Sequence, residues 1–237
     1  MGKEEDALVG KEVRVLLARE AAALGMVIPP STADALLVYF GLLLRWGARI
    51  NLTAARSGAA LATDHLPDAL ALASRFAVRG GTETGSGRRC LDAGSGGGLP
   101  AIPLALLRPE LSLVLVEATA KKAAFLRTAV RELGLETRVA VENRRLVPGT
   151  GEHPDRESDG AVGEFDAAIS RAMLPPEEWL PLGRSLVRPG GVVFYLGARR
   201  LEEPLGGLRL LHQQRYRQDD HRSGRSDRWL AELERST

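Results

Sequence analysis

Apolar residues in the first third of the chain recur at the spacing of α-helices. The pattern predicts an amphipathic helix over Val13–Leu24, which Gly25 and a pair of prolines end. A second helix is expected to begin at a capping box, Ser31-Thr32-Ala33-Asp34, and to run to about Trp46. Helical spacing resumes over Ala59–Ala77. We therefore expect residues 1–78 to form an N-terminal helical extension.

A connector rich in Gly, Ser and Thr at 79–89 leads into a region where short apolar runs alternate with helical segments. The predicted strands are Cys90–Asp92, Ser112–Val116, Arg138–Val141, Phe165–Ile169 and Val192–Leu196. The predicted helices are Leu99–Leu107, Lys121–Leu133 and Pro176–Leu186. This alternation predicts an α/β domain over residues 90–237, with a mainly parallel, doubly wound sheet.

Two segments of this domain do not follow its pattern. The stretch at 148–164 is polar and rich in Gly, Asp and Glu, so we expect a surface loop there. Arg209–Arg217 and Arg228–Glu234 are candidates for a closing pair of strands.

The composition narrows the class of protein but does not identify an activity. Hydrophobic residues make up 44% and charged residues 26% of the 237 residues, which fits a folded chain rather than a disordered one. No apolar run reaches the ~18 residues of a membrane span. The single cysteine, Cys90, excludes an internal disulfide, so we expect a cytoplasmic protein without membrane contact. Net charge is only +2, yet 28 of the 32 basic residues are Arg, which suits local phosphate contacts.

The first candidate site is a glycine-rich turn between a strand and a helix. Asp92 is followed by Gly94, Gly96 and Gly98, and Glu117 ends the next strand, 19 residues after Gly98. Glycines allow a sharp turn and let a ligand approach the backbone closely. An acid at that distance can accept hydrogen bonds from both hydroxyls of a ribose. The alternative is a tight turn with a surface acid, but the combined pattern favours a nucleotide site.

The spacing of the glycines bears on the identity of the cofactor. Dinucleotide-binding turns follow G-x-G-x-x-G and hold a pyrophosphate at the helix N-terminus. Here the glycines fall at G-x-G-x-G, two residues after Asp92. That carboxylate would repel a pyrophosphate but can orient water or the amino group of an amino-acid tail. The pattern therefore favours S-adenosylmethionine over NAD.

Five segments between about Leu42 and Leu196 resemble, in order, the motifs of one family. Leu44–Thr53 resembles L-x-W-N-x-x-x-N-L-T, His65–Leu70 resembles R-H-x-x-D-S, and Leu91–Leu104 resembles L-D-V-G-S/T-G-x-G-x-P-G-I-P-L. Lys121–Arg127 and Ser170–Ala172 resemble G-K-R-x-x-F-L and S-R-A. The chain is thus similar to a divergent member of the RsmG (GidB) family, the bacterial 16S ribosomal RNA guanine-N7 methyltransferases.

The resemblance implies a class I S-adenosylmethionine-dependent methyltransferase fold. This fold is α/β and Rossmann-like, with a mainly parallel seven-stranded sheet and, here, an N-terminal helical extension. The implied activity is methylation of N7 of a guanine, with S-adenosyl-L-methionine as cofactor and 16S ribosomal RNA or the small ribosomal subunit as partner of a monomeric protein. The candidate cofactor-binding residues are Asp92, Gly94, Ser95, Gly96, Gly98, Leu99, Glu117, Asn143, Arg144 and Arg171.

The catalytic candidates are Arg171, Asn51 and His65. Arg171 is expected at the end of the fourth strand, on the edge where α/β folds bind ligands. Asn51 and His65 are expected to line the entrance for the substrate. The alternative for Arg171 is an ion pair with a structural carboxylate, and the alternative for His65 is a packed, hydrogen-bonded ring.

The chain departs from the family pattern at five places. Gly47 replaces an Asn, Asp64 an Arg, Glu117 an Asp and Gly197 a Lys. Leu146-Val147 replaces two acids. A methyltransferase of this fold acting on a small molecule or a protein therefore stays open as an alternative. So does an RNA-binding or ribosome-assembly factor without catalysis, whereas the glycine spacing disfavours an NAD-dependent enzyme.

Overall fold

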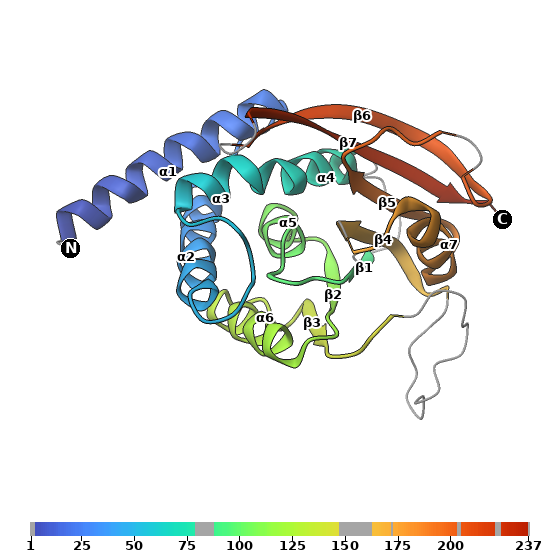
Figure 1. Ribbon diagram of the computed structural model, residues 1–237, viewed down its shortest axis with the longest axis horizontal. Coiled ribbons are helices and arrows are strands. Elements are labelled where there is room, and N and C mark those ends of the chain that lie inside the picture. The colour runs from blue at the N-terminus through green and yellow to red at the C-terminus, as the bar shows by residue number, and fades with distance from the viewer. Residues whose placement is uncertain are drawn as a thin grey trace.

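The computed structural model describes residues 3–78, 88–146, 163–171, 173–202, 205–220 and 224–236. Within these residues seven strands form one sheet in the order β3-β2-β1-β4-β5-β7-β6 (Figure 1). The strands are β1 Arg89–Ala93, β2 Ser112–Val116, β3 Val139–Glu142, β4 Phe165–Arg171, β5 Val187–Gly197, β6 Leu208–Asp220 and β7 Gly224–Arg235. The first five pair in parallel, and β7 runs antiparallel to both β5 and β6. The closing pair of strands predicted from the sequence is therefore confirmed.

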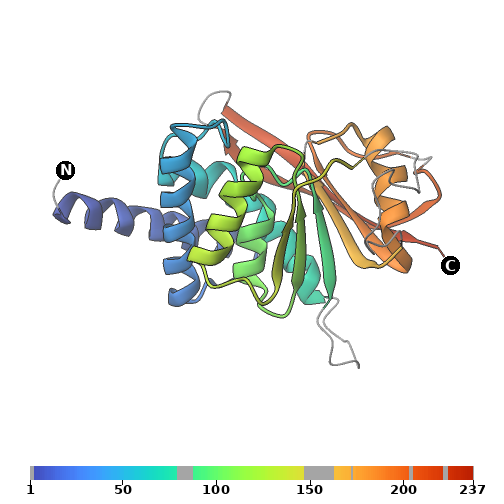
Figure 2. The same ribbon diagram turned by 90° about the horizontal axis from the view of Figure 1, so that it is seen from below.

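The helices lie unevenly on the two faces of the sheet. They are α1 Lys3–Ala23, α2 Pro30–Gly47, α3 Gly58–Asp64, α4 Leu66–Val78, α5 Ala101–Leu107, α6 Ala120–Glu132 and α7 Pro176–Leu186. One face is covered by α2, α4, α5 and α6, and α7 lies on the other (Figure 2). Both α1 and α3 pack against α4. Within the described residues, no helix is long and apolar enough to cross a membrane.

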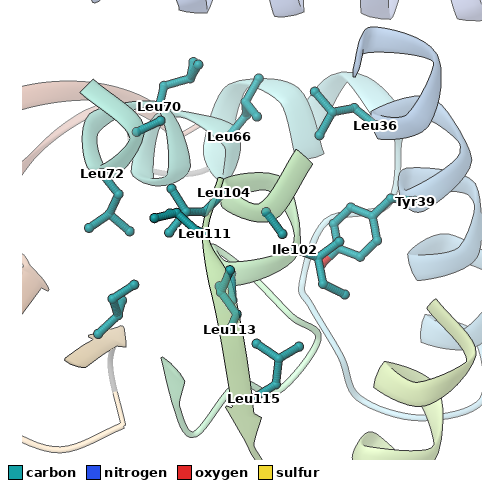
Figure 3. Packing of buried hydrophobic residues seen from close by; sticks show 14 of the residues in the cluster. Leu36, Tyr39, Leu66, Leu70, Leu72, Ile102, Leu104, Leu111, Leu113 and Leu115 are labelled. Carbon is teal, nitrogen blue, oxygen red and sulfur yellow. The ribbon is translucent and has the colours of Figure 1, made fainter. Parts of the chain in front are cut away.

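Alternate residues of the strands divide between two cores, because successive side chains of a strand point to opposite faces. Leu113 and Leu115 of β2 pack into the larger core, whereas Val114 and Val116 belong to the core under α7. Side chains from α2, α4, α5 and β2 meet in the larger core (Figure 3): Leu36, Tyr39, Leu66, Leu70, Ile102 and Leu104 are among them. The N-terminal helices thus share a continuous core with the sheet. The domain division at 79–89 stays a prediction, and residues 79–87 lie outside the described part of the chain.

Several predicted helix ends are wrong. The predicted capping box does not form, since α2 begins at Pro30 and its N-cap, Pro29, has no side chain that accepts a hydrogen bond. Proline suits the first helical turn because it lacks an N–H and its φ is already helical. The first helix begins at Lys3 instead of Val13, and the helix predicted from Leu99 begins at Ala101.

The helix predicted over 59–77 is two helices, because His65 leaves the helical path between α3 and α4 at φ −125°. Its side chain is used in the site described below. The predicted loop at 148–164 falls almost entirely outside the described residues, which resume at Gly163.

Candidate functional site

The candidate site lies at the carboxyl ends of β1, β2 and β4. The chain leaves β1 toward β2 on one side, and β4 pairs with β1 on the other side, so this is the switch point at which doubly wound sheets bind ligands. A cavity of about 500 Å³ opens here. Its lining includes four residues singled out from the sequence, namely Gly94, Glu117, Arg144 and Arg171.

The glycine-rich turn after β1 is held by backbone hydrogen bonds. The amides of Gly94 and Ser95 both donate to the carbonyl of Val116 at the end of β2, at 2.9 and 3.0 Å. Gly94, Gly96 and Gly98 adopt φ of 69°, 56° and 80°, a region that side chains with a Cβ rarely occupy. A Cβ on Gly98 would collide with Ile102 at 2.7 Å, whereas one on Gly96 would meet nothing nearer than 3.8 Å. The free space in the turn therefore lies beside Gly96.

Glu117 holds the turn from the neighbouring strand. It is only 7% exposed, and its two carboxylate oxygens accept hydrogen bonds from the amides of Gly96 (2.8 Å) and Thr119 (2.7 Å). Each carboxylate oxygen can accept a further hydrogen bond, so ligand hydroxyls can still be bound there. Asn143 donates to the carbonyls of Glu117 (2.8 Å) and Ala118 (3.1 Å). Asn143 therefore supports the segment that carries Glu117, and a direct contact of Asn143 with a cofactor stays a prediction.

Asp92 is a buried carboxylate with an oxygen that lacks a partner. The residue is 1% exposed, and Oδ2 has no hydrogen-bond donor within the described part of the chain. Burial raises its pKa from 3.8 to about 7, although the positive charge of Arg171 acts in the opposite direction. Asp92 does not belong to the described lining of the cavity, but it directly precedes the glycine turn, and an unpaired buried carboxylate there is suited to binding a cationic group.

Tyr39 of α2 also holds the glycine-rich turn. The sequence analysis did not identify this residue as part of the site. Its hydroxyl donates to the carbonyl of Gly97 at 2.6 Å, and the side chain is fully buried. Burial and the nearby Asp92 raise the pKa of this phenol well above 10. Tyr39 lies on the apolar face of its helix, and nothing in the local pattern distinguishes it from a core residue.

Arg171 joins the site to the N-terminal helices. Its Nε lies 2.8 Å from Oδ2 of Asp68, and its Nη2 lies 2.7 Å from Nδ1 of His65. Because Arg can only donate, Nδ1 must accept, and the ring proton must lie on Nε2. That nitrogen is 2.9 Å from the hydroxyl of Thr53. Burial, together with Arg171, lowers the pKa of His65 to about 4, so its ring is neutral near pH 7.

Asp68 is the centre of this network. It is fully buried and also accepts a hydrogen bond from the hydroxyl of Tyr216 on β6, at 2.5 Å. Arg228 on β7 lies 4.0 Å from the same carboxylate. Burial and the charge of Asp68 raise the pKa of Tyr216. One carboxylate of α4 thus connects β4, β6 and β7. Arg171 therefore forms an ion pair with a structural carboxylate, the alternative given in the sequence analysis, and it also lines the cavity.

The remaining candidates lie at the margin. Arg144 lines the cavity and pairs with Glu142 at 2.7 Å. Leu99 is half-buried and packs against the larger core, and Asn51 is exposed in the turn after α2. Neither Leu99 nor Asn51 belongs to the described lining of the cavity. Their roles in binding or catalysis stay predictions.

Comparison with known proteins places this geometry in context. Residues 32–219 match the family described as rRNA small subunit methyltransferase G. A relative named "Ribosomal RNA small subunit methyltransferase G" from Anaeromyxobacter dehalogenans is 37% identical over 187 residues, which cover 78% of this chain and 79% of the relative. A second protein of that name, from Anaeromyxobacter sp., is 34% identical over 223 residues, or 91% of this chain and 96% of the relative.

Among solved structures, the O-methyltransferase TomG from Streptomyces achromogenes, in complex with SAM, is similar with a TM-score of 0.52. The two chains are 19% identical over 85% of this chain and 90% of TomG, so the likeness is one of fold. It confirms the predicted α/β class I methyltransferase fold.

Proposed function

The chain belongs to the rRNA small subunit methyltransferase G family, and from this premise we propose that it methylates N7 of a guanine in 16S ribosomal RNA, with S-adenosylmethionine as the methyl donor. The observation that carries the proposal is the free space beside Gly96, whose amide donates to Glu117, in a turn that follows the unpartnered carboxylate of Asp92. The monomeric state and the cytoplasmic location stay predictions.

The residues of the site fit this cofactor. Glu117 can accept hydrogen bonds from the two ribose hydroxyls, and Asp92 can bind the cationic amino group of the methionine part. Leu146, Met173 and Leu174 supply an apolar wall of the cavity for an adenine ring. Two carboxylates at the turn do not fit a pyrophosphate, which disfavours NAD.

The chemistry asks little of acid or base groups. N7 of guanine has a lone pair and no proton, so no general base is needed. The sulfonium of the donor supplies the methyl group, and the bond from N7 to carbon forms as the bond from sulfur to carbon breaks. The protein must hold the two reactants in line, which contributes on the order of several kcal/mol to lowering the barrier.

Within this scheme Arg171 is the residue positioned to contact the RNA. Asp68 and His65 engage its Nε and Nη2, and Nη1 has no partner among the described residues, so it can donate to guanine or to a phosphate. His65 is a neutral ring with both nitrogens engaged. It therefore acts as a positioning residue for Arg171 and not as an acid or base. Asn51, which is exposed in the turn after α2, is proposed to contact the RNA.

The first test is binding of the cofactor. The wild-type protein is expected to bind S-adenosylmethionine with micromolar affinity in isothermal titration, and NAD not at all. Gly96→Asp places a carboxylate in the free space beside two existing acids, and binding is expected to disappear.

Gly134→Asp is a matched control for this variant. Gly134 follows the end of α6 and has φ 64°, close to the 56° of Gly96, and a Cβ there meets no atom within 4 Å. Its variant is expected to bind S-adenosylmethionine like the wild type. A wild-type protein that binds neither ligand, or a Gly96→Asp variant that binds S-adenosylmethionine normally, would refute the assignment of the site.

Glu117 gives a second test of the same site. Glu117→Ala removes the ribose acceptor and also the anchor of the Gly96 and Thr119 amides. We expect the dissociation constant for S-adenosylmethionine to rise by more than about 100-fold, since two hydrogen bonds to a charged group contribute about 3–6 kcal/mol. Glu117→Asp, the acid of the family pattern, is expected to keep affinity within about tenfold of wild type. Equal affinities for Glu117→Ala and wild type would remove Glu117 from the site.

A further inference from the structure

A second hollow lies on the other side of the end of β4. It has a volume of about 270 Å³, and its described lining includes Ser170, Leu174, Trp179, Tyr195, Gly197 and Arg228. Leu174 lines both this hollow and the larger cavity, and Ser170 directly precedes Arg171. The two spaces therefore flank the same strand end. We call the smaller one the acceptor hollow.

The acceptor hollow is lined from both faces of the sheet. Tyr195 and Trp179 belong to the core under α7, and Leu196 belongs to the larger core. Arg228 pairs across the strands with Tyr216, whose hydroxyl contacts Asp68 on the α4 side. An aromatic and aliphatic wall with one arginine is suited to a flat heteroaromatic ring that has an acceptor at its edge.

The polar groups of the hollow can still form hydrogen bonds with a ligand. The side chain of Arg228 is 27% exposed, and its nearest carboxylate oxygen, on Asp68, is 4.0 Å away. The hydroxyl of Tyr195 has no hydrogen-bond partner within the described part of the chain, although the residue is 6% exposed. Arg228 supplies only donors, whereas a phenol can both donate and accept.

Tyr195 and Gly197 explain one departure of this chain from its family. A Cβ at position 197 would overlap the hydroxyl and ring of Tyr195, so the tyrosine can occupy this place only because residue 197 is a glycine. The family pattern described above has a lysine where this chain has Gly197. The present position of Tyr195 in the wall of the hollow therefore depends on the glycine at position 197.

We propose that the acceptor hollow receives the guanine base that is methylated, with Arg228 donating to O6 and the Tyr195 hydroxyl making a second polar contact. This inference rests on the proposed function, since methyl transfer needs a base beside the cofactor. A base must leave its stack to reach such a site, and it is then held by aromatic contact and by hydrogen bonds to its edge. Arg228 selects guanine because adenine presents an amino donor where guanine has O6.

The test uses small ribosomal subunits that lack the modification, with transfer of a labelled methyl group as readout. Arg228→Ala is expected to lower kcat/KM for the subunit by about 10- to 100-fold, the usual effect of losing a base-reading arginine. Tyr195→Phe is expected to lower it about 3- to 10-fold, for one hydrogen bond. Both variants should bind S-adenosylmethionine within twofold of wild type. Arg209→Ala is the matched control, because Arg209 lies on β6, is 66% exposed and pairs with Glu234.

A second readout separates base reading from a structural role. Once the methylated position is mapped, an RNA with 2,6-diaminopurine there lacks O6 but keeps N7. For the wild type, kcat/KM on this RNA is expected to fall about as much as Arg228→Ala lowers kcat/KM on the guanine RNA. For Arg228→Ala itself, kcat/KM is expected to be the same on both RNAs. Equal losses in both proteins would overturn the contact between Arg228 and O6.

The outcomes distinguish the two claims. If the wild type binds no S-adenosylmethionine or methylates no subunit, the proposed function fails. If the wild type is active and Arg228→Ala and Tyr195→Phe are equally active, only the acceptor hollow fails. If circular dichroism shows that Arg228→Ala is unfolded, Arg228→Lys takes its place beside Tyr195→Phe. Lowered kcat/KM with unchanged cofactor binding in these variants supports the inference, and wild-type rates overturn it.

Discussion

Asp68→Asn is expected to lower the free energy of unfolding by about 3–5 kcal/mol, the range seen when one partner of a buried ion pair is removed. The carboxylate is fully buried and holds Arg171 at 2.8 Å and the hydroxyl of Tyr216 at 2.5 Å. An amide in its place carries no charge, so Arg171, only 14% exposed, would be left without a counterion. Methyl transfer should fall as well, because Arg171 would no longer be fixed.

Urea unfolding followed by circular dichroism measures this effect. Tyr216→Phe removes only the hydrogen bond to Asp68, and it should cost about 1.5–3 kcal/mol, the value for a hydrogen bond to a charged group. Glu177→Gln is the matched control, since Glu177 is exposed and its one ion pair among the described residues is with the exposed Arg199. Its unfolding midpoint should not change. If the Asp68→Asn protein is as stable as the wild type, the network around Asp68 does not hold the N-terminal helices to the sheet.

Local sequence signals predict the parts of this protein that are built from neighbouring residues. The turn after β1 is one, because its glycines, Asp92 and the following helix are adjacent in the chain. The predicted limits Ser112–Val116 and Pro176–Leu186 coincide with β2 and α7. Proline at the first turn marks the start of α7, and β2 is a short run of Leu and Val after Ser112.

The network around Asp68 could not be predicted in this way. Tyr216 is 148 positions from Asp68, and Arg171 is 106 positions from His65. No periodicity or spacing connects residues so far apart, and only the packing of β6 and α4 brings them together. The break at His65 has the same origin. The helical pattern of the sequence continues through this position, but His65 leaves the helical path and its ring contacts Arg171.

Two departures from the family pattern have local explanations. Asp64, in place of an arginine, accepts a hydrogen bond from the hydroxyl of Thr63 at 2.8 Å. Leu146, in place of an acid, lines the larger cavity and extends its apolar wall. Neither change disturbs Glu117 or the glycine turn, so both are compatible with the proposed cofactor site.

Asp92→Asn is expected to abolish cofactor binding and yet to stabilise the free protein at alkaline pH. The folded protein holds the pKa of Asp92 near 7, above its ordinary value of 3.8, because the carboxylate is buried. Stability from the bound proton is fully present below pH 3.8 and is lost as the pH rises toward 7. Asparagine does not titrate, so the stability of the variant relative to the wild type should increase with pH across this window.

The comparison of pH 5 with pH 8 tests both halves of this prediction. At about 1.4 kcal/mol per pH unit up to about 7, the difference in unfolding free energy between variant and wild type should grow by on the order of 2–3 kcal/mol. Any packing defect of the amide is the same at both pH values and cancels from this difference. Wild-type affinity for S-adenosylmethionine should fall about tenfold per pH unit below 7, because only ionised Asp92 pairs with the cationic amino group. A variant that binds the cofactor normally, or a stability difference that does not change with pH, would mean that Asp92 is not the buried anion of the site.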